Sequence, residues 1–207
     1  MNLIENPHLN LKDPVNSSIS LIRGNLKYYH YICDGFDDKG WGCGYRTLQT
    51  IFSWIKEQQE LCHVSDISSQ PVPSILDIQK ALVDISDKPQ SFIGSREWIG
   101  SLEVAYAIDY FYKVQCRIIH ARNLNDLKEH IKDIANHLIE FGSPIMMGGD
   151  EDCSSKCILG ISINHEMIWL LILDPHYSGN TTSKDELQVN GWIKWQLIDS
   201  LDHNSFL

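Results

Sequence analysis

The stretch KGWGCGYRTLQTIFSWI, residues 39–55, places Cys43 between two glycines just before a helical pattern. Apolar side chains then recur at the i, i+3, i+4, i+7 spacing of one helix face, at Leu48, Ile51, Phe52 and Ile55. A helix starting here would hold the thiol at the positive end of the helix dipole, which favours the thiolate. Gly42 and Gly44 would leave the approach to the sulfur open. This stretch alone supports a nucleophile and a small buried residue equally.

The composition limits what the chain can do. Its 207 residues fit one domain, or one domain with a modest extension, and 43% hydrophobic residues suffice for a sizeable core. The formal net charge of -10 gives no sign of the basic face that nucleic-acid binding requires. We therefore expect no nucleic-acid partner, and a neutral or basic macromolecular partner instead.

The distribution of apolar residues and cysteines indicates in which cellular compartment the protein is expected. The longest apolar run, residues 167–173, is far too short to span a bilayer. The first twenty residues carry polar side chains where a secretory signal needs an apolar stretch. Six cysteines are too sparse for a disulfide scaffold. We expect a monomer with reduced thiols in the cytoplasm or also the nucleus, with no direct membrane insertion.

The order of the predicted elements indicates the fold class. Residues 1–25 are polar and aperiodic, typical of an arm or a loose edge, and residues 26–207 form the expected single domain. After the helix that follows Cys43, further helices are predicted over 74–85 and 123–141, and another within 94–112, which opens with a small-residue turn. Strands are predicted over 26–33, 114–120, 144–149, 157–163, 167–174 and 191–199, with a tight hairpin at 164–166. Helices followed by an antiparallel sheet predict an α+β domain rather than a doubly wound parallel sheet.

A second motif, LLILDPHYSG at residues 170–179, supplies what a cysteine nucleophile needs. Asp174 and His176 stand at i and i+2 after an apolar strand, so their side chains share one face of the extended chain. A thiol nucleophile needs a base, and the base needs a group that orients it. Cys43, His176 and Asp174 therefore form a candidate catalytic set.

The sequence resembles the UFM1-specific proteases, which are papain-like cysteine peptidases of family C78. The resemblance rests on GWGCGYRTLQ (40–49), SREWIGSLE (95–103) and LDPHYSG (173–179), and it covers roughly residues 28–195. The autophagy cysteine proteases share the Gly-Trp-Gly-Cys and Asp-Pro-His boxes, so those two boxes alone do not fix the substrate. The length is similar to that of the short members of the family.

The resemblance implies a papain-like fold, with the nucleophile at the N-terminus of a helix packed on a mainly antiparallel sheet. It implies Cys43 as nucleophile, His176 as general base and Asp174 as its orienter. It also implies that Tyr31 helps to form the oxyanion hole, where a phenol and the Cys43 backbone N–H could hold the developing charge. From the sequence alone Tyr28 and Tyr29 compete with Tyr31 for this role.

Further candidates line the expected substrate groove. Trp98 is either a core aromatic residue or a wall of the groove for the substrate tail. Gly148 and Gly149, in MMGGDED (146–152), belong to a solvated turn or, as the resemblance implies, to a flexible loop that borders the site.

Other cysteines and the histidines are assigned no chemistry. Cys33 is interpreted as a packing residue. Cys153 and Cys157 lie near Asp150, Asp152 and His165, but a structural zinc site usually needs two closely spaced pairs. We therefore predict no metal site and no cofactor.

The function that the resemblance implies is cleavage of precursor UFM1 after its C-terminal glycine and hydrolysis of UFM1–substrate isopeptide bonds. The partners would be the UFM1 precursor and UFM1-conjugated proteins. The alternatives are a protease for another ubiquitin-like modifier, of the autophagy type, a non-proteolytic thiol transferase, or a UFM1-binding pseudoenzyme or adaptor. The chain ends at Leu207, where the family usually continues a little further, so weaker packing near the sheet is also expected.

Overall fold

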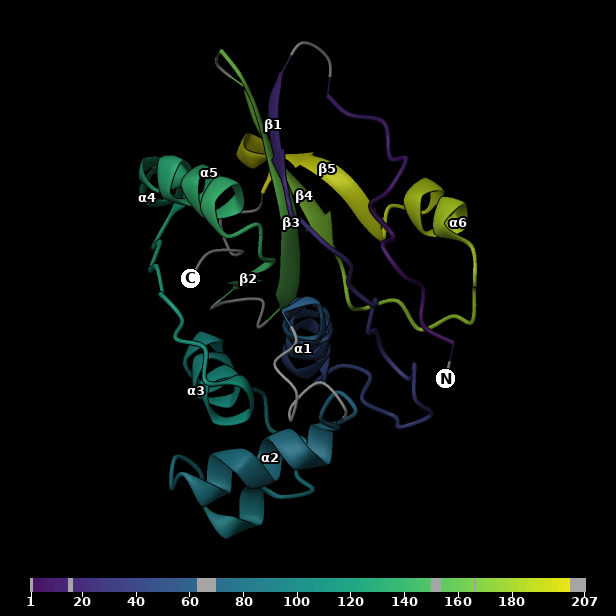
Figure 1. The fold of residues 1–207 in the computed structure, drawn as a ribbon, viewed down its shortest axis with the longest axis vertical. Coiled ribbons are helices and arrows are strands. Elements are labelled where there is room, and N and C mark those ends of the chain that lie inside the picture. The colour runs from purple at the N-terminus through teal and green to yellow at the C-terminus, as the bar shows by residue number, and fades with distance from the viewer. Residues whose placement is uncertain (1, 15–16, 63–69, 150–153, 166, 202–207) are drawn as a thin grey trace.

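The computed structural model describes residues 2–14, 17–62, 70–149, 154–165 and 167–201. Within them the strands are β1 (Ser18–Leu21), β2 (Ile145–Gly148), β3 (Ser155–Asn164), β4 (Met167–Leu173) and β5 (Ile193–Leu197). The α-helices are α1 (Cys43–Leu61), α2 (Ile75–Asp84), α3 (Ser101–Tyr112), α4 (Leu124–Glu129), α5 (Ile131–Glu140) and α6 (Lys184–Val189). Two short 3-10 helices are η1 (Gln90–Phe92) and η2 (Ile198–Ser200). Helices pack around one antiparallel sheet (Figure 1), which confirms the α+β class.

The sheet is organised around β3. Its strand order is β1-β3-β4-β5, every pairing is antiparallel, and β2 also pairs with β3. β1 and β2 share one edge of β3, because β1 pairs with its second half and β2 with its first half. A glycine, Gly160, lies where β1 crosses, and a Cβ atom there would stand 2.4 Å from Leu21 Cδ2. A side chain at this position would require Leu21 to move and would crowd the Ser20 carbonyl oxygen, 3.1 Å away.

Helix α1 begins at Cys43 and packs against β2, β3 and α3. Leu48 and Phe52 of its predicted apolar face are fully buried. Because Cys157 of β3 pairs with Leu173 of β4, the start of β3 and the end of β4 lie at the same end of the sheet. In Figure 1 α1 lies at this end. The fold thus brings Cys43 and the segment after β4 into one region.

Several predicted elements differ from the structure. The strand predicted over 26–33 is wrong: this buried segment forms one isolated bridge, between Glu5 and Lys27. The Tyr28 amide donates to the Ile4 carbonyl (2.9 Å) as part of this bridge, whereas the Tyr29 amide donates to a side chain, Thr50 Oγ1 (3.1 Å). The aromatic composition that indicated a strand here reflects burial instead.

Other predicted boundaries are also corrected. Residues 114–120 form no strand, α3 starts only at Ser101, and the helix predicted over 123–141 is divided at His130 into α4 and α5. Ser18–Leu21, within the expected arm, form the edge strand β1. The hairpin between β3 and β4 is confirmed, since Asn164 pairs with Met167.

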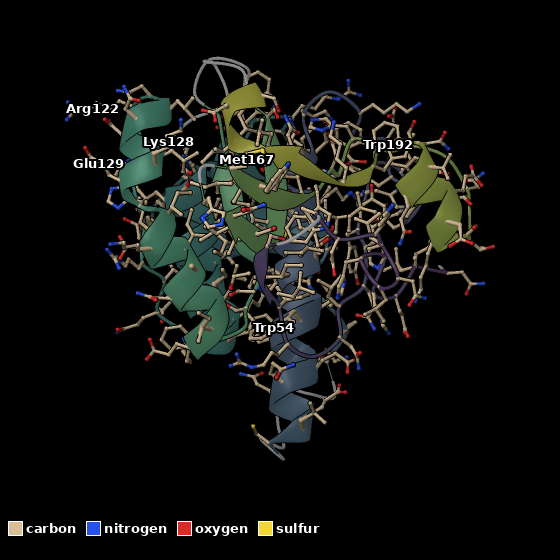
Figure 2. The ribbon with its side chains drawn as sticks, turned by 90° about the horizontal axis from the view of Figure 1, so that it is seen from above. Trp54, Arg122, Lys128, Glu129, Met167 and Trp192 are labelled. Carbon is tan, nitrogen blue, oxygen red and sulfur yellow. The ribbon has the colours of Figure 1, made fainter. Side chains whose placement is uncertain are left out.

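The helices cover the sheet from different sides. Figure 2 shows α4, with Lys128 and Glu129, at one side of the molecule and Trp192, beside α6, at the other. Helix α5 packs on β1 and β3, and α6 on β5. Every helix within the described ranges is too short or too polar to cross a lipid bilayer.

The N-terminus of α2 gives a prediction for stability. Ser74 Oγ accepts from the Asp77 amide (3.2 Å), and Asp77 Oδ2 accepts from the Ser74 amide (3.1 Å), the capping box expected from the sequence. Ser74→Ala should lower the free energy of unfolding by about 1 kcal/mol, measured by urea denaturation. The control Lys132→Ala, at an exposed position of α5, should change it by less than about 0.5 kcal/mol. Equal effects of the two substitutions would contradict this account of the cap.

Candidate active site

Cys43 is the first residue of α1 and is buried, with 4% of its surface exposed. The N-cap residue is Gly42, which has no side chain to cap the helix. Amide groups of the first turn therefore point toward the thiol without an intrahelical partner. This is the placement that the sequence predicted, and it favours negative charge on the sulfur.

Asp174 and His176 follow the last residue of β4. The backbone N–H of Asp174 donates to the Trp192 carbonyl (2.8 Å), which continues the ladder toward β5 for one more residue. The Asp174 carboxylate accepts from the His176 backbone N–H (2.9 Å) and from its imidazole Nδ1 (2.5 Å). Since a carboxylate only accepts, Nδ1 carries the proton and Nε2 is left for the thiol.

The imidazole of His176 hydrogen bonds to the Cys43 thiol. Burial alone would raise the pKa of Cys43, but the hydrogen bonds from His176 and from the backbone of Ser155 bring that pKa below its ordinary value. Burial would likewise lower the pKa of His176, but hydrogen bonds to Asp174 and Cys43 raise it to about 9. The two shifts favour a thiolate–imidazolium pair at neutral pH.

The carboxylate of Asp174 is held in its charged form. Burial would raise its pKa, but the two hydrogen bonds from His176 lower it below the usual value. The positive charge of Lys156 acts in the same direction. A charged carboxylate behind the imidazole stabilises the imidazolium and fixes which nitrogen faces the thiol.

Tyr31 lies beside both members of the pair. Its hydroxyl hydrogen bonds to Cys43, and its ring packs edge-on against His176, with centroids 5.2 Å apart at 89°. Its backbone N–H donates to the Pro175 carbonyl (3.0 Å). Burial and the adjacent Cys43 raise the pKa of this phenol, so it remains a proton donor. The structure therefore brings Cys43, His176, Asp174 and Tyr31 together.

The two competing tyrosines point elsewhere. Tyr28 is fully buried and its hydroxyl donates to the Asp174 carbonyl, so it supports the backbone of the acidic residue. Burial raises the pKa of Tyr29 to about 12, and its backbone N–H is tied to α1 through Thr50. Contact with Cys43 distinguishes Tyr31 from both.

The glycines beside Cys43 have a packing role rather than the open approach expected from the sequence. A Cβ atom on Gly42 would lie 2.1 Å from Asp38 Oδ2. One on Gly44 would lie 2.7 Å from the backbone oxygen of Ile99. Both positions exclude a side chain because neighbouring segments already occupy the space. The glycines let two loops close onto the start of α1.

The predicted groove residues lie around this centre. Trp98 is 53% exposed and precedes Ile99, whose carbonyl rests against Gly44. Gly148 pairs with Ser155, whose backbone hydrogen bonds to Cys43. The amide of Gly149 donates to the Ser154 carbonyl (2.9 Å). Trp98, Gly148 and Gly149 are thus adjacent to residues that contact Cys43 or its neighbour Gly44, and their role in a groove stays a prediction. Residues 150–152 of the predicted loop lie outside the described residues.

Sequence reasoning missed Ser155. Its contribution is a backbone hydrogen bond at the start of β3, and a backbone donor leaves no residue-type signature. The metal-site alternative involves Cys153, which lies outside the described residues, and Cys157, a buried thiol whose pKa burial raises. No cluster of three or more His, Cys, Asp or Glu side chains that could hold a metal occurs in the described part of the chain.

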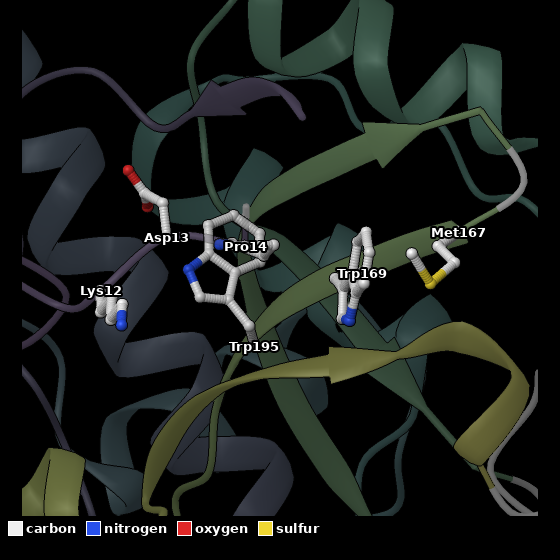
Figure 3. Close-up of a pocket in the computed structure, with 6 residues that line it drawn as sticks. All are labelled: Lys12, Asp13, Pro14, Met167, Trp169 and Trp195. Carbon is white, nitrogen blue, oxygen red and sulfur yellow. The ribbon is translucent and has the colours of Figure 1, made fainter. Parts of the chain in front are cut away.

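A separate hollow of about 360 Å³ lies over β4 and β5 (Figure 3). It contains none of Cys43, His176, Asp174 and Tyr31. Its lining residues are Lys12, Asp13, Pro14, Met167, Trp169 and Trp195. The candidate active site therefore lies at the opposite end of β4, where Asp174 follows the last residue of the strand.

Comparison with known proteins agrees with this site. Residues 17–207 match the profile of peptidase family C78. The chain belongs to peptidase family C78. It is 40% identical to Ufm1-specific protease 1 of Mus musculus, over 100% of this chain and 92% of that protein. It is 44% identical to a probable Ufm1-specific protease of Oryza sativa subsp. japonica, over 91% of this chain but 28% of that protein.

The fold is also that of a solved C78 structure. A crystal structure of UfSP from C. elegans superimposes with a TM-score of 0.81 at 34% identity, over 99% of this chain and 36% of that one. The papain-like fold expected from the sequence is confirmed. The chain spans most of the mouse protease but about a third of the C. elegans protein.

The Asp174–His176 hydrogen bond predicts how activity depends on pH. In this C78 peptidase Asp174→Asn should lower kcat/KM by about 100-fold or more, because the imidazolium loses its partner. Removing the carboxylate also removes a cause of the raised His176 pKa of about 9, so the alkaline limb of the kcat/KM profile should move to lower pH. The weaker imidazolium should raise the Cys43 pKa, moving the acid limb to higher pH.

The control for this substitution is Asp185→Asn, in the exposed first turn of α6. Its pH profile should match that of the wild type. An unchanged alkaline limb in Asp174→Asn would contradict the assignment of Asp174 as the group that holds the imidazolium.

The close contact at Gly44 gives a further prediction. Gly44→Ala should destabilise the protein by about 1–3 kcal/mol, because the new methyl group meets backbone that must shift. It should also slow alkylation of Cys43 by iodoacetamide, because the start of α1 moves. Urea denaturation and alkylation rates measure the two effects, and wild-type values for both would refute the packing role of Gly44.

Proposed function

We propose that this chain is a cysteine protease that cleaves precursor UFM1 after its C-terminal glycine and hydrolyses UFM1–substrate isopeptide bonds. The observation that carries the proposal is the contact set of Cys43, His176, Asp174 and Tyr31. It occurs in a chain similar over its whole length to a protein named Ufm1-specific protease 1. Both proposed reactions are acyl transfers at a glycine carbonyl, so one site serves both.

The first half of the reaction forms an acyl-enzyme. The Cys43 thiolate attacks the glycine carbonyl carbon, and the carbonyl electron pair moves onto oxygen. The Tyr31 hydroxyl and the Cys43 backbone N–H donate to this oxyanion, and one such donor is typically worth about 100- to 1000-fold in kcat. As the tetrahedral intermediate collapses, His176 gives its proton to the leaving amine. The products are a free amine and a UFM1 thioester.

The second half releases UFM1. His176, now neutral, accepts a proton from water while the water oxygen attacks the thioester carbonyl. The carbon–sulfur bond breaks, the sulfur leaves as thiolate, and His176 is again imidazolium. The cycle needs no metal or cofactor, and Asp174 holds the imidazole in one orientation throughout.

Substrate selection would follow from the rim of the site. A narrow groove between exposed Trp98 on one side and Gly148 and Gly149 on the other would admit only a chain end that lacks side chains, such as a terminal glycine. The net charge of -10 favours a neutral or basic partner. The folded part of the modifier would be this partner, and it would bind to the surface outside the groove.

We further propose that the protein acts as a monomer in the cytoplasm or nucleus. Within the described part of the chain no disulfide joins Cys33, Cys43, Cys62, Cys116 or Cys157, which supports a reducing compartment. A catalytic thiolate would also remain active only where it stays reduced.

The experiment is cleavage of UFM1 carrying a C-terminal fusion, beside equivalent ubiquitin and autophagy-modifier fusions. Wild type should cut the UFM1 fusion at the glycine, and Cys43→Ser should reduce the rate by about 1000-fold or more. Electrophoresis and mass spectrometry of the product define the bond. Folded Cys43→Ser protein that still cleaves would refute the nucleophile. Preference for the autophagy modifier, or binding of UFM1 without cleavage, would favour the alternatives.

A further inference from the structure

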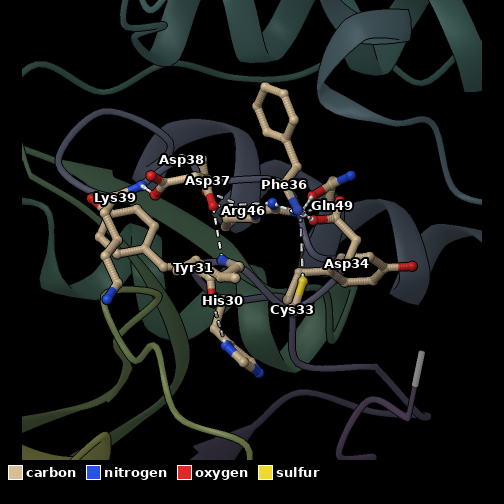
Figure 4. A network of polar contacts seen from close by, with 12 residues as sticks. His30, Tyr31, Cys33, Asp34, Phe36, Asp37, Asp38, Lys39, Arg46 and Gln49 are labelled. Atoms are coloured by element: carbon tan, nitrogen blue, oxygen red, sulfur yellow. Dashed lines mark hydrogen bonds and ion pairs between the residues drawn. The ribbon is translucent and has the colours of Figure 1, made fainter.

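Arg46 is the largest fully buried side chain in the described residues and lies one turn after Cys43 on α1. Its Nε donates to Asp38 Oδ2 (2.8 Å), and its terminal nitrogens donate to both carboxylate oxygens of Asp34 (2.8 Å each). It also donates to Gln49 Oε1 (3.0 Å). Figure 4 shows this arginine between the two acids. The guanidinium therefore fixes the loop that precedes α1 to the helix that carries the thiol.

The charges of this cluster are deeply placed. The side chains of Arg46 and Asp38 are both 0% exposed, and that of Asp34 is 29% exposed. Burial would lower the pKa of Arg46, but hydrogen bonds with Asp34 and Asp38 raise it, so the side chain remains charged. A buried ion pair is costly to desolvate and contributes little net stability. The presence of this ion pair next to the reactive centre therefore favours a role in positioning the catalytic groups over a role in stability.

Asp38 links Arg46 to Ile32, the residue that follows Tyr31. Its Oδ1 accepts from the Ile32 backbone N–H (2.8 Å), and its carbonyl accepts from the Gly42 N–H (2.8 Å). Ile32 has a φ of +60°, a left-handed conformation that is strained for a β-branched residue. Such a backbone persists only when its surroundings hold it in place, and the hydrogen bond to Asp38 does so.

We propose that Arg46 is a positioning residue. It keeps the Tyr31 hydroxyl beside Cys43, where that hydroxyl donates to the oxyanion formed when the thiolate attacks the carbonyl. The inference rests on the protease function proposed above. Arg46 orients Asp38, Asp38 holds Ile32 in its left-handed turn, and this turn aims the Tyr31 ring across His176 at Cys43. The bidentate fork of arginine is needed, because two acids must be held at once from one side chain.

Lysine at this position is the decisive substitution. Arg46→Lys keeps the buried positive charge but cannot span Asp34 and Asp38 with fixed geometry. The matched control is Arg23→Lys, since the Arg23 guanidinium donates to the carbonyls of Leu138, Ile139 and Glu140 at the end of α5. Arg23 follows β1 and is exposed, and neither its segment nor α5 supplies a residue to the site. This control therefore removes an arginine fork at a distance from the reacting groups.

The measurements are kcat and KM for the UFM1 fusion, the iodoacetamide alkylation rate of Cys43, and urea denaturation. Arg46→Lys should lower kcat by about 10- to 100-fold with KM changed by less than about 3-fold, because an oxyanion donor is displaced. The alkylation rate should fall by less than kcat does, because the hydrogen bond from Tyr31 lowers the pKa of Cys43 by less than the hydrogen bond from His176. Arg23→Lys should keep wild-type kcat.

A double variant separates positioning from general damage. Tyr31→Phe removes the hydroxyl, so adding Arg46→Lys to it should lower kcat by no more than about 2-fold further. A full, multiplicative loss in that background would overturn the proposal, as would wild-type kcat in folded Arg46→Lys. If Arg46→Lys does not fold, Asp34→Asn takes its place, with the same non-additivity expected. Wild-type kcat in Asp34→Asn would then be the contradicting result.

The same assay distinguishes the two levels of proposal. If wild type cleaves no UFM1 fusion, the proposed function fails. If wild type cleaves normally and the arginine variants do as well, only the role of Arg46 fails.

Discussion

The thiolate–imidazolium pair of Cys43 and His176 is the interaction on which the rest of the site depends. A buried thiol would ordinarily stay protonated, because burial disfavours its anion. Here the hydrogen bond and positive charge of His176, together with the backbone hydrogen bond from Ser155, outweigh that penalty, and the pKa of the thiol falls. The imidazolium is itself buried in part, and hydrogen bonds to Asp174 and Cys43 raise its pKa despite that burial. Each charge in the site thus exists because the next one is in place.

The sheet supplies the precision that such a chain of charges needs. Asp174 leaves β4 while its amide is still bonded to the Trp192 carbonyl, and its own carbonyl accepts from Tyr28. The acidic residue is therefore held by its backbone on two sides before its side chain meets His176. An i, i+2 pair at a free strand end would sample many geometries, whereas this one is fixed by neighbours from two distant segments.

How far the sequence predicts this arrangement depends on whether the cause is local. The start of α1 follows from a periodicity of a few residues, and it is found. Asp174 and His176 also meet, but Pro175 and His176 form a turn in which the His176 backbone N–H donates to the Asp174 carboxylate, so the alternation of an extended chain is not what pairs them. The segment 26–33 was misread because a buried aromatic loop and a strand have the same composition, and only the partners of its amides distinguish them. The sequence favours an open approach to the Cys43 sulfur as the role of Gly42 and Gly44, because nothing in it shows that Asp38 and Ile99 lie against these glycines.

Arg46 illustrates the same limit from the opposite direction. An arginine on a helix is expected at the surface, yet this one is fully enclosed by acids from the preceding loop. Its partners lie 8 and 12 residues away, at distances that no helical or strand period links. Loop structure of this kind is decided by charge satisfaction inside the core, and so appears only in three dimensions.

The comparison with longer relatives shows which part of the chain the chemistry requires. This chain matches about a third of the C. elegans protein and 28% of the rice protein, yet the match includes nearly all of its own residues. Tyr31, Cys43, Asp174 and His176 all fall within the family match over 17–207. The hydrogen bonds that place them also begin and end within this span. Assembly of the site is therefore a property of the α+β unit.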